Sequence, residues 1–332
     1  MEMFRCLRVN STRSAMPNYG TLENDMPVKY QNLEYTKKPS FKDFWNLART
    51  PRKHWKYRND LKQGPPPPNR VMGKDLRVTM INHMTLLIQT MGLNILTDPI
   101  WSKRCSPFQW AGPKRYRSPG ILFTDLPPID MILLSHDHYD HMDKTTLRKL
   151  HEAYQPTIIT GKGVSRHLRK WNINTGVELD WWETHHWSEQ VQITATPAKH
   201  FSGRTLWDRN KTLWVGLWVH TPNGGIYFAG DTGMGTHFEQ INEKLGAPRL
   251  SLIPIGAFQP RWFMAPVHLD PQQAWEAHKI LHSQTSIATH YGTFALAMDG
   301  QSEPEDEILR YQQQEPEVNF WILGHGEGRL LP

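Results

Sequence analysis

Short apolar runs that end in turns dominate the chain after Arg70. Three of them, Leu76–Ile81, Thr85–Thr90 and Leu93–Leu96, are close enough in sequence to predict an antiparallel meander. Similar runs predict strands at Met131–Leu134, Val191–Thr196, Thr212–His220, Gly225–Ala229, Leu250–Ile255, Ser286–Thr289 and Phe320–Leu323. Helical patterns lie between them, at Asp143–Glu152, Gly235–Leu245, Pro271–Leu281 and Glu305–Gln314. This alternation predicts an α/β fold of two packed sheets flanked by helices.

The first 69 residues differ from the rest and predict a basic N-terminal extension to a main domain at residues 70–332. Four prolines at 65–68 predict an extended polyproline II spacer at the boundary. Ser40 and Asp43 resemble a capping box, which predicts a short helix with Phe41, Phe44, Trp45 and Ala48 on one face. Two roles stay open for this basic amphipathic helix: contact with a membrane surface, or packing of its aromatic rings on the main domain.

Composition excludes several classes of protein. Cys6 and Cys105 are the chain's two cysteines and lack CxxC spacing, which excludes a disulfide scaffold and a thiolate zinc knuckle and fits a reducing compartment. No segment approaches the roughly 20 apolar residues of a spanning helix. No apolar region follows the arginines near the N-terminus, so a secretory signal is not expected. We expect a cytoplasmic protein without a nucleic-acid partner, with peripheral membrane contact and a homodimer left open. The net charge of +6 suits an anionic partner or simple solubility.

The strongest chemical signal is the segment Ser135-His136-Asp137-His138-Tyr139-Asp140-His141, which directly follows an apolar strand. So many polar groups at a strand end are costly to bury unless they coordinate something. His136 and His138 are two residues apart and point to one side if the chain stays extended. Asp140 and His141 fall in the following turn, where they offer ligands to a second, neighbouring metal. Imidazole and carboxylate ligands suit zinc.

Three later residues of ligand type also stand just after predicted strands: His200, Asp231 and His290. An α/β scaffold builds its site from loops that meet at one set of strand ends. Gly230 and Gly233 flank Asp231 and allow close backbone approach. We therefore expect these three side chains to join the histidine-rich segment in one site.

The segment His136–His141 resembles the HxHxDH signature of the metallo-β-lactamase superfamily, whose fold is a four-layer αββα sandwich. The downstream His, Asp and His are the remaining ligands expected in that superfamily. The resemblance implies that His136, His138 and His200 hold a first metal, that Asp140, His141 and His290 hold a second, and that Asp231 bridges both.

Longer segments narrow the resemblance to the N-acylphosphatidylethanolamine-hydrolysing phospholipase D family. They are Leu96–Ile100, Gly112–Arg115, Leu126–Asp130, Leu179–Glu183, Pro260–Met264 and His290–Leu296. The similarity runs from about Val78 to His325. One departure is Asn82-His83-Met84-Thr85, where the family commonly shows Gly-His-Ala-Thr.

The resemblance implies a zinc-dependent hydrolase with two Zn²⁺ per chain and a phospholipid substrate. Two metals that share a carboxylate lower the pKa of a bridging water, and the resulting hydroxide would attack the phosphodiester phosphorus with Asp231 orienting it. The products would be phosphatidic acid and an N-acylethanolamine. The alternatives are a hydrolase of a soluble phosphorylated or lactone substrate, a di-iron redox enzyme, and an inactive metal-binding module associated with a membrane. The fold alone does not choose among them.

For several further residues, the sequence leaves more than one role open. His268 and His325 are expected to act in catalysis, by assisting the leaving group or binding phosphate, or else to be structural. His83 is expected to support a loop or a ligand through a hydrogen bond, or else to take part directly, and Asp98 is expected to support a ligand through a hydrogen bond. His185-His186 is expected to be a solvated pair in a polar turn. Arg261-Trp262-Phe263-Met264 suits a lipid interface or a lid packed on the core.

Overall fold

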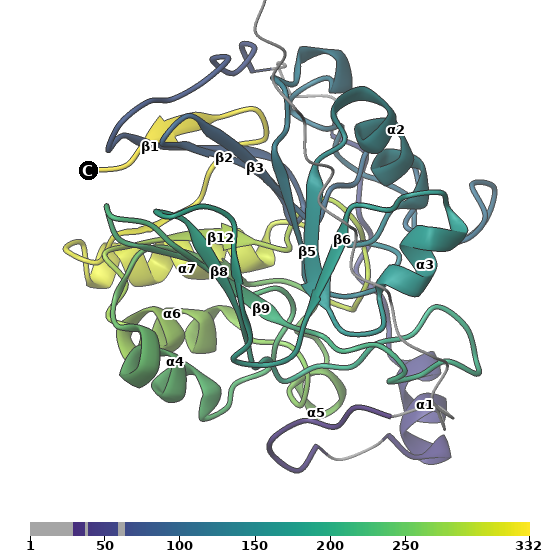
Figure 1. Cartoon of the computed structure of the whole chain (residues 1–332). Coiled ribbons are helices and arrows are strands. Elements are labelled where there is room, and N and C mark those ends of the chain that lie inside the picture. Colours follow the sequence, from purple (N-terminus) through teal and green to yellow (C-terminus); the bar gives the residue numbers. More distant parts are fainter. Residues whose placement is uncertain (1–28, 37–38, 59–63) are drawn as a thin grey trace, which may run out of the picture.

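The computed structural model describes residues 29–36, 39–58 and 64–332 (Figure 1). Its first sheet has seven strands in the order β14-β1-β2-β3-β4-β5-β6 within these residues. They are β1 (Leu76–Asn82), β2 (Thr85–Thr90), β3 (Leu93–Thr97), β4 (Met131–Leu134), β5 (Thr157–Gly161), β6 (Gly176–Leu179) and β14 (Gly328–Leu330). Strands β1 to β3 pair antiparallel as the predicted meander, and β3 to β6 are parallel.

The second sheet has the order β13-β12-β11-β10-β9-β8-β7 in the described part of the chain. Its strands are β7 (Thr184–His186), β8 (Gln192–Thr196), β9 (Gly216–His220), β10 (Gly225–Phe228), β11 (Pro248–Pro254), β12 (Thr285–Thr289) and β13 (Phe320–Trp321). Strands β7 to β10 pair antiparallel and β10 to β13 pair parallel, so the two sheets have the same mixed organisation.

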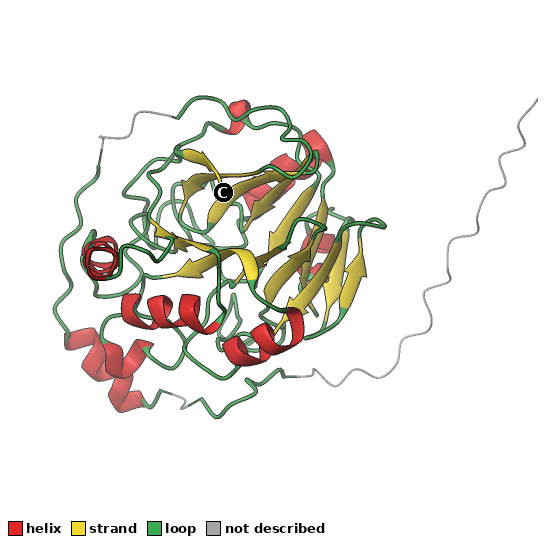
Figure 2. Cartoon of the chain, turned by 90° about the vertical axis from the view of Figure 1, so that its left-hand side faces the viewer, coloured by secondary structure: helices red, strands yellow, loops and turns green. Residues whose placement is uncertain are grey.

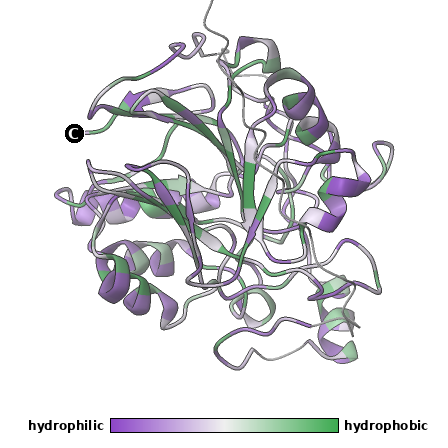
Figure 3. Ribbon diagram, in the orientation of Figure 1, coloured by the Kyte–Doolittle hydropathy of each residue, from purple (hydrophilic) through white to green (hydrophobic). Residues whose placement is uncertain are grey.

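Helices cover the outer face of each sheet, which gives four layers (Figures 1 and 2). Helices α2 (Lys144–Tyr154) and α3 (Ser165–Lys170) lie on the first sheet, and α4 (His237–Leu245), α6 (Pro271–Ile280) and α7 (Glu303–Gln314) lie on the second. The strands are largely apolar and the helices are polar on their outer faces (Figure 3). The main core joins side chains of both sheets, such as Met80, Leu86, Leu217 and Phe228. The predicted αββα sandwich is confirmed.

The apolar patterns predict the four longest covering helices to within two residues at each end. They do not predict β5, β6, β7, β14 or α3; β5 has five residues, as many as the predicted β3, so length alone does not explain the omission. The expected polar turn at His185-His186 is wrong, because both residues belong to β7 and pair with β8. This edge strand is mostly exposed and therefore has no apolar alternation to reveal it. The strand expected at Thr212–His220 begins only at Gly216, because Val215 N donates to Ser135 O in the first half of the fold.

The described part of the N-terminal extension packs along the main domain. Trp55 is buried and its Nε1 donates to Asp299 O at 3.0 Å. Helix α1 (Phe41–Arg49) begins with the predicted capping box between Ser40 and Asp43, and the ring of Phe44 packs edge-on against Phe263. Phe263 belongs to the single turn α5 (Arg261–Met264). The predictions that concern Cys6 and the N-terminal arginines lie outside the described residues. None of the helices in the described part of the chain has the length and apolarity needed to span a bilayer.

Candidate metal centre

The predicted ligands stand where strands of both sheets end. The histidine-rich segment follows β4, His200 follows β8, Asp231 follows β10 and His290 follows β12. Gly230 makes this meeting of the two sheets possible, because a Cβ atom at this position would lie 2.6 Å from the Cβ of Ser135. Gly230 also has a φ of +62°, which favours glycine. The close contact between the ends of β4 and β10 therefore requires a residue without a side chain.

Three residues of the centre are non-glycine residues in the left-handed region: His83 (φ 45°), Asp98 (φ 28°) and His290 (φ 61°). Such backbone conformations cost of order 1–3 kcal/mol each and persist where the surroundings impose them. Seven other non-glycine residues of the described chain share this conformation, so the strain is consistent with a functional site without identifying one.

A first group of donors consists of three histidine nitrogens. His138 Nδ1 lies 2.8 Å from His136 Nε2 and 3.3 Å from His200 Nε2, and the three atoms lie within 4.8 Å of one another. Ligand atoms about 2.1 Å from a tetrahedral zinc ion are separated from each other by about 3.4 Å. The first group therefore has the size of a zinc site.

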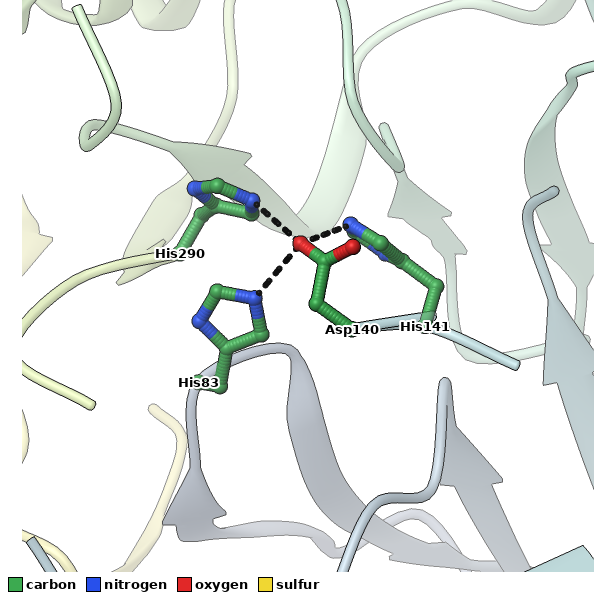
Figure 4. A group of neighbouring side chains, drawn as sticks. All are labelled: His83, Asp140, His141 and His290. Carbon is green, nitrogen blue, oxygen red and sulfur yellow. Dashed lines mark hydrogen bonds and ion pairs between the residues drawn. The ribbon is translucent and has the colours of Figure 1, made fainter. Parts of the chain in front are cut away.

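A second group of donors surrounds one carboxylate oxygen, as Figure 4 shows. Asp140 Oδ2 lies 3.1 Å from His141 Nε2, 3.3 Å from His290 Nε2 and 3.2 Å from His83 Nε2. The sequence predicts three of these residues as ligands and His83 as a support. The structure places the His83 ring among the donors themselves, so His83 has the position of a fourth donor.

Asp231 lies between the two groups. Its Oδ2 is 3.2 Å from His141 Nε2 and 3.3 Å from His290 Nε2 in the second group, and 3.7 Å from His200 Nε2 in the first. Asp231 Oδ1 is buried and has no hydrogen-bond partner among the described residues, which costs about 1–3 kcal/mol for such an atom. A pair of divalent cations, one in each group, would satisfy this carboxylate. The nitrogen and oxygen donor set fits zinc.

Burial keeps the first group neutral. Desolvation lowers the pKa of His138 to about 4 and that of His200 to about 3, and it holds the pKa of His136 well below its usual range together with the charge of His141. Neutral imidazole is the form that binds metal. At pH 7 the first group is therefore ready to bind a cation without losing protons.

The second group is different because two carboxylates belong to it. Burial alone would raise the pKa values of Asp140 and Asp231, but the positive charge of His141 outweighs it and holds both pKa values well below the usual range. Burial alone would lower the pKa of His290, but the charge of Asp231 and a hydrogen bond to Asp140 raise it to about 9. The pKa of His141 is likewise raised well above its usual range, against burial, by Asp231 and Asp140. In the metal-free protein, protons on these two rings take the place of a cation.

Asp98 hydrogen-bonds to the ring nitrogen of His141 that does not face the second donor group. Its Oδ2 accepts a hydrogen bond from His141 Nδ1 at 2.6 Å, while Oδ1 accepts from Ser135 N at 2.8 Å. The carboxylate is fully buried. This contact confirms the support predicted for Asp98 and turns Nε2 of His141 toward the second group.

The extension contributes a residue that the sequence does not point to. Asn32 Oδ1 accepts from His200 N at 3.0 Å and from Trp214 Nε1 at 2.9 Å, and Asn32 Nδ2 donates to His200 O at 2.9 Å. Asn32 therefore fixes the backbone of a first-group ligand from a segment more than 160 residues away in the sequence. No pattern around Asn32 distinguishes it from other polar residues of the extension.

The two candidate catalytic histidines have different positions. His268 Nδ1 lies 4.0 Å from Asp231 Oδ2 and forms a donor group with Asp231 and His200. His325 instead donates from Nδ1 to Ser118 O at 3.2 Å and belongs to none of the donor groups found in the described residues. The structure brings His268 to the centre and leaves His325 outside the donor groups.

Residues 93–291 match the family model of the beta-lactamase superfamily domain. N-acyl-phosphatidylethanolamine-hydrolyzing phospholipase D 1 of Caenorhabditis elegans is 36% identical to the chain over 269 residues, which covers 76% of this chain and 75% of the relative. The chain belongs to the metallo-β-lactamase superfamily, in its N-acylphosphatidylethanolamine-hydrolysing phospholipase D-like branch. The resemblance predicted from the motifs is confirmed.

A mitochondrial N-acyl-phosphatidylethanolamine-hydrolyzing phospholipase D of Saccharomyces cerevisiae is 36% identical over 223 residues, covering 65% of this chain but only 47% of the yeast protein. Among solved structures, Igni18, a metallo hydrolase of Ignicoccus hospitalis, has a TM-score of 0.60 at 20% identity and covers 78% of this chain and 99% of that one. The latter similarity shows the fold alone. Family membership and the donor groups together support a metal-dependent hydrolase.

Proposed function

We propose that the chain is a dinuclear zinc hydrolase of the phospholipase D type. Its substrate is an N-acylphosphatidylethanolamine-like lipid, and its products are phosphatidic acid and an N-acylethanolamine. The contact of Asp231 Oδ2 with both donor groups carries the dinuclear part of this proposal. The names of the Caenorhabditis and Saccharomyces relatives support the substrate class.

The ligand roles follow the two donor groups. His136, His138 and His200 would hold one zinc ion; Asp140, His141 and His290 would hold the other; and Asp231 would bridge them. Zinc supplies an acidified water and stabilises negative charge on phosphoryl oxygens. Asp231 Oδ1 has no partner among the described residues, so this atom can accept a hydrogen bond from the attacking water and orient it.

His268 has the position of a phosphate-binding residue. Burial lowers its pKa to about 3, so the ring is neutral at pH 7 and donates a hydrogen bond rather than a full proton. Its Nδ1 is buried, has no hydrogen-bond partner among the described residues, and faces Asp231. We therefore assign His268 to a phosphoryl oxygen of the substrate. A catalytic role of His325 stays a prediction, because its hydrogen bond is to Ser118.

An exposed aromatic surface on α1 and α5 supports contact with lipid. It consists of the exposed residues Phe41, Phe44, Trp45 and Trp262 and the half-buried Phe263. Phe41 is 85% exposed, Trp45 53% and Trp262 52%, and the rings of Phe44 and Phe263 join the two elements. Exposed aromatic rings on a basic helix favour the interface of a membrane. We infer a peripheral attachment of a cytoplasmic protein through this aromatic surface; a homodimer stays a prediction.

The test combines metal analysis with turnover. Purified protein is analysed for zinc and iron, and is assayed on N-acylphosphatidylethanolamine and on a soluble phosphodiester, with and without chelator. We expect about two zinc ions per chain and release of N-acylethanolamine that chelator abolishes. Two zinc ions per chain without lipid cleavage would contradict the proposed lipid substrate. Bound iron in place of zinc would contradict the proposed hydrolytic mechanism.

A further inference from the structure

A cavity of about 440 Å³ lies beside the metal centre, between the start of α2 and the end of α3. Arg104, Lys144, Lys170 and Arg204 line it, together with the rings of Tyr139 and Trp171. None of the candidate metal ligands lines this cationic cavity. Tyr139 joins the two regions, because it stands in the chain between the candidate ligands His138 and Asp140.

The cations of the cavity outnumber its carboxylates, and none of the four is in a close ion pair with a described residue. Neither Lys144 nor Lys170 forms an ion pair with a described residue, and the same holds for Arg104 and Arg204. A cavity with four cationic walls therefore has charge available for an anion.

The two carboxylates that line the cavity are already used. Asp143 caps α2 and accepts hydrogen bonds from Ser102 Oγ and Thr146 Oγ1. Asp208 Oδ1 accepts from the backbone nitrogens of Arg204 at 3.0 Å and Thr205 at 2.8 Å. These hydrogen bonds fix the two carboxylates but leave their charges in place, so the four cations and two carboxylates of the lining give it a net positive charge.

Arg204, one of the cations of the cavity, is held in a fixed orientation by its neighbours. Its guanidinium lies 3.9 Å from the ring centroid of Tyr139 and 5.3 Å from that of Trp171. Nη1 donates to the carbonyl oxygens of Asp137 and Met142, at 2.6 and 3.0 Å. The side chain of Tyr139 also hydrogen-bonds to Arg204, so the guanidinium is held in place by the protein and contributes its charge to the cavity.

Exposed apolar residues stand next in the chain to several residues that line the cavity. Pro107 and Gln109 line it, and their neighbours Phe108 and Trp110 are exposed, Trp110 by 79%. Thr205 and Asp208 also line it, and their chain neighbours Leu206 and Trp207 are 90% and 82% exposed. A cationic hollow between exposed aromatic loops has the chemistry of a lipid headgroup site, whereas a site for a soluble anion needs no such border.

We propose that the cationic cavity binds the phosphate of an anionic phospholipid headgroup in a bilayer, at a site separate from the metal centre. The proposal rests on the proposed function only in its choice of a bilayer as partner. A phosphate between Lys144, Lys170 and Arg204 would place Phe108, Trp110 and Trp207 in the interface. Through Tyr139, the bound headgroup would also fix the loop that carries His138 and Asp140.

The test measures binding of the full chain to vesicles of phosphatidylcholine with and without phosphatidylglycerol. The double variant Lys144→Gln/Lys170→Gln removes two charges from the cavity, and Lys74→Gln/Lys149→Gln removes two exposed charges elsewhere. We expect the cavity variant to lose about thirtyfold in affinity for phosphatidylglycerol vesicles. The control variant should lose less than about threefold, because its two lysines lie outside the cavity and make no direct contact with a headgroup bound there. Zinc content and circular dichroism check that both variants fold.

Equal losses in the two variants, or no loss in either, would overturn the proposal. If soluble glycerol phosphate binds to the cavity while the protein binds both kinds of vesicle equally well, the cavity recognises a free phosphate rather than a lipid headgroup. Turnover of N-acylphosphatidylethanolamine dispersed in detergent is measured in parallel and should match the wild type in both variants. If the wild-type protein shows no such turnover, the proposed function is wrong. The comparison of vesicle binding would still test whether the cavity binds a lipid headgroup.

Discussion

The metal centre and the aromatic surface of α1 and α5 are built in opposite ways. In the metal centre every predicted ligand except His138 and Asp140 is almost fully buried, and the distances between donor atoms are 2.8 to 3.7 Å. In the aromatic surface none of the residues of α1 is buried, and one pair of rings connects α1 to α5. The first region depends on the position of single atoms, whereas the second depends on the total apolar area that it exposes. Single substitutions should therefore have large effects in the first region and small, additive effects in the second.

The largest effect is expected at the residue that joins both donor groups. Asp231→Asn keeps the shape of the side chain but removes the charge that faces His141 and His290. We expect turnover to fall below about a thousandth of the wild-type rate, with lower zinc content and a largely unchanged fold. Lipid turnover, metal analysis and a thermal melt measure the three quantities. The exposed Asp75→Asn is the matched control, and activity retained in Asp231→Asn would contradict the bridging role.

The second-largest effect is a difference between the two donor groups in how their zinc affinity depends on pH. His290 has a pKa of about 9 in the metal-free protein, above the ordinary 6.5, so its proton is bound at pH 7 and must leave when metal enters the second group. The first-group histidines have lowered pKa values and lose no proton at this pH. Affinity of the second zinc should fall about tenfold per pH unit for each displaced proton between pH 9 and pH 7, while that of the first changes little. Chelator competition at several pH values measures both constants.

The same proton also affects the stability of the metal-free protein. A histidine with a raised pKa contributes stability that is full below pH 6.5 and is lost as the pH rises through about 9. Metal-free protein should therefore melt at a lower temperature at pH 9 than at pH 7, as a thermal melt at the two pH values would measure. A metal affinity that does not change with pH would contradict the protonation assigned to the second group.

The buried centre was largely predictable from sequence, and the reason is its chemistry. Histidines and aspartates that directly follow apolar strands stand out against the background, as with Asp231 after β10 and His290 after β12. The four-layer fold was predictable because long strands and helices have clear periodicity. Short exposed elements such as β7 have no such signal.

The residues that sequence could not reveal act through tertiary contacts alone. Asn32 reaches His200 only because the extension folds back on the domain. Lys144, Lys170 and Arg204 come from separate segments and form one cavity only when α2, α3 and the β8–β9 loop are assembled. Each of these residues is an ordinary polar side chain in its local sequence context.

A smaller effect is expected at Asn32, which lies at the junction of the extension and the metal centre. Asn32→Ala removes three hydrogen bonds that hold His200 and Trp214. We expect about tenfold weaker binding of the first zinc, as for other residues that orient a metal ligand, with the second zinc unaffected. The exposed Asn46→Ala in α1 is the matched control. Equal zinc affinity in both variants would show that the extension does not position His200.

The smallest effects are expected on the aromatic surface. Phe41→Ser and Trp45→Ser each remove one exposed ring from α1 without touching a buried contact. Each should weaken binding to neutral vesicles by a few fold, roughly the effect of about 1 kcal/mol of apolar burial, and the double variant should show the product of the two. Leu309→Ser, an exposed apolar residue on α7, is the control. Because the surface acts through its total area, neither ring is indispensable; a single substitution that abolished vesicle binding would mean that α1 recognises lipid through a defined pocket instead.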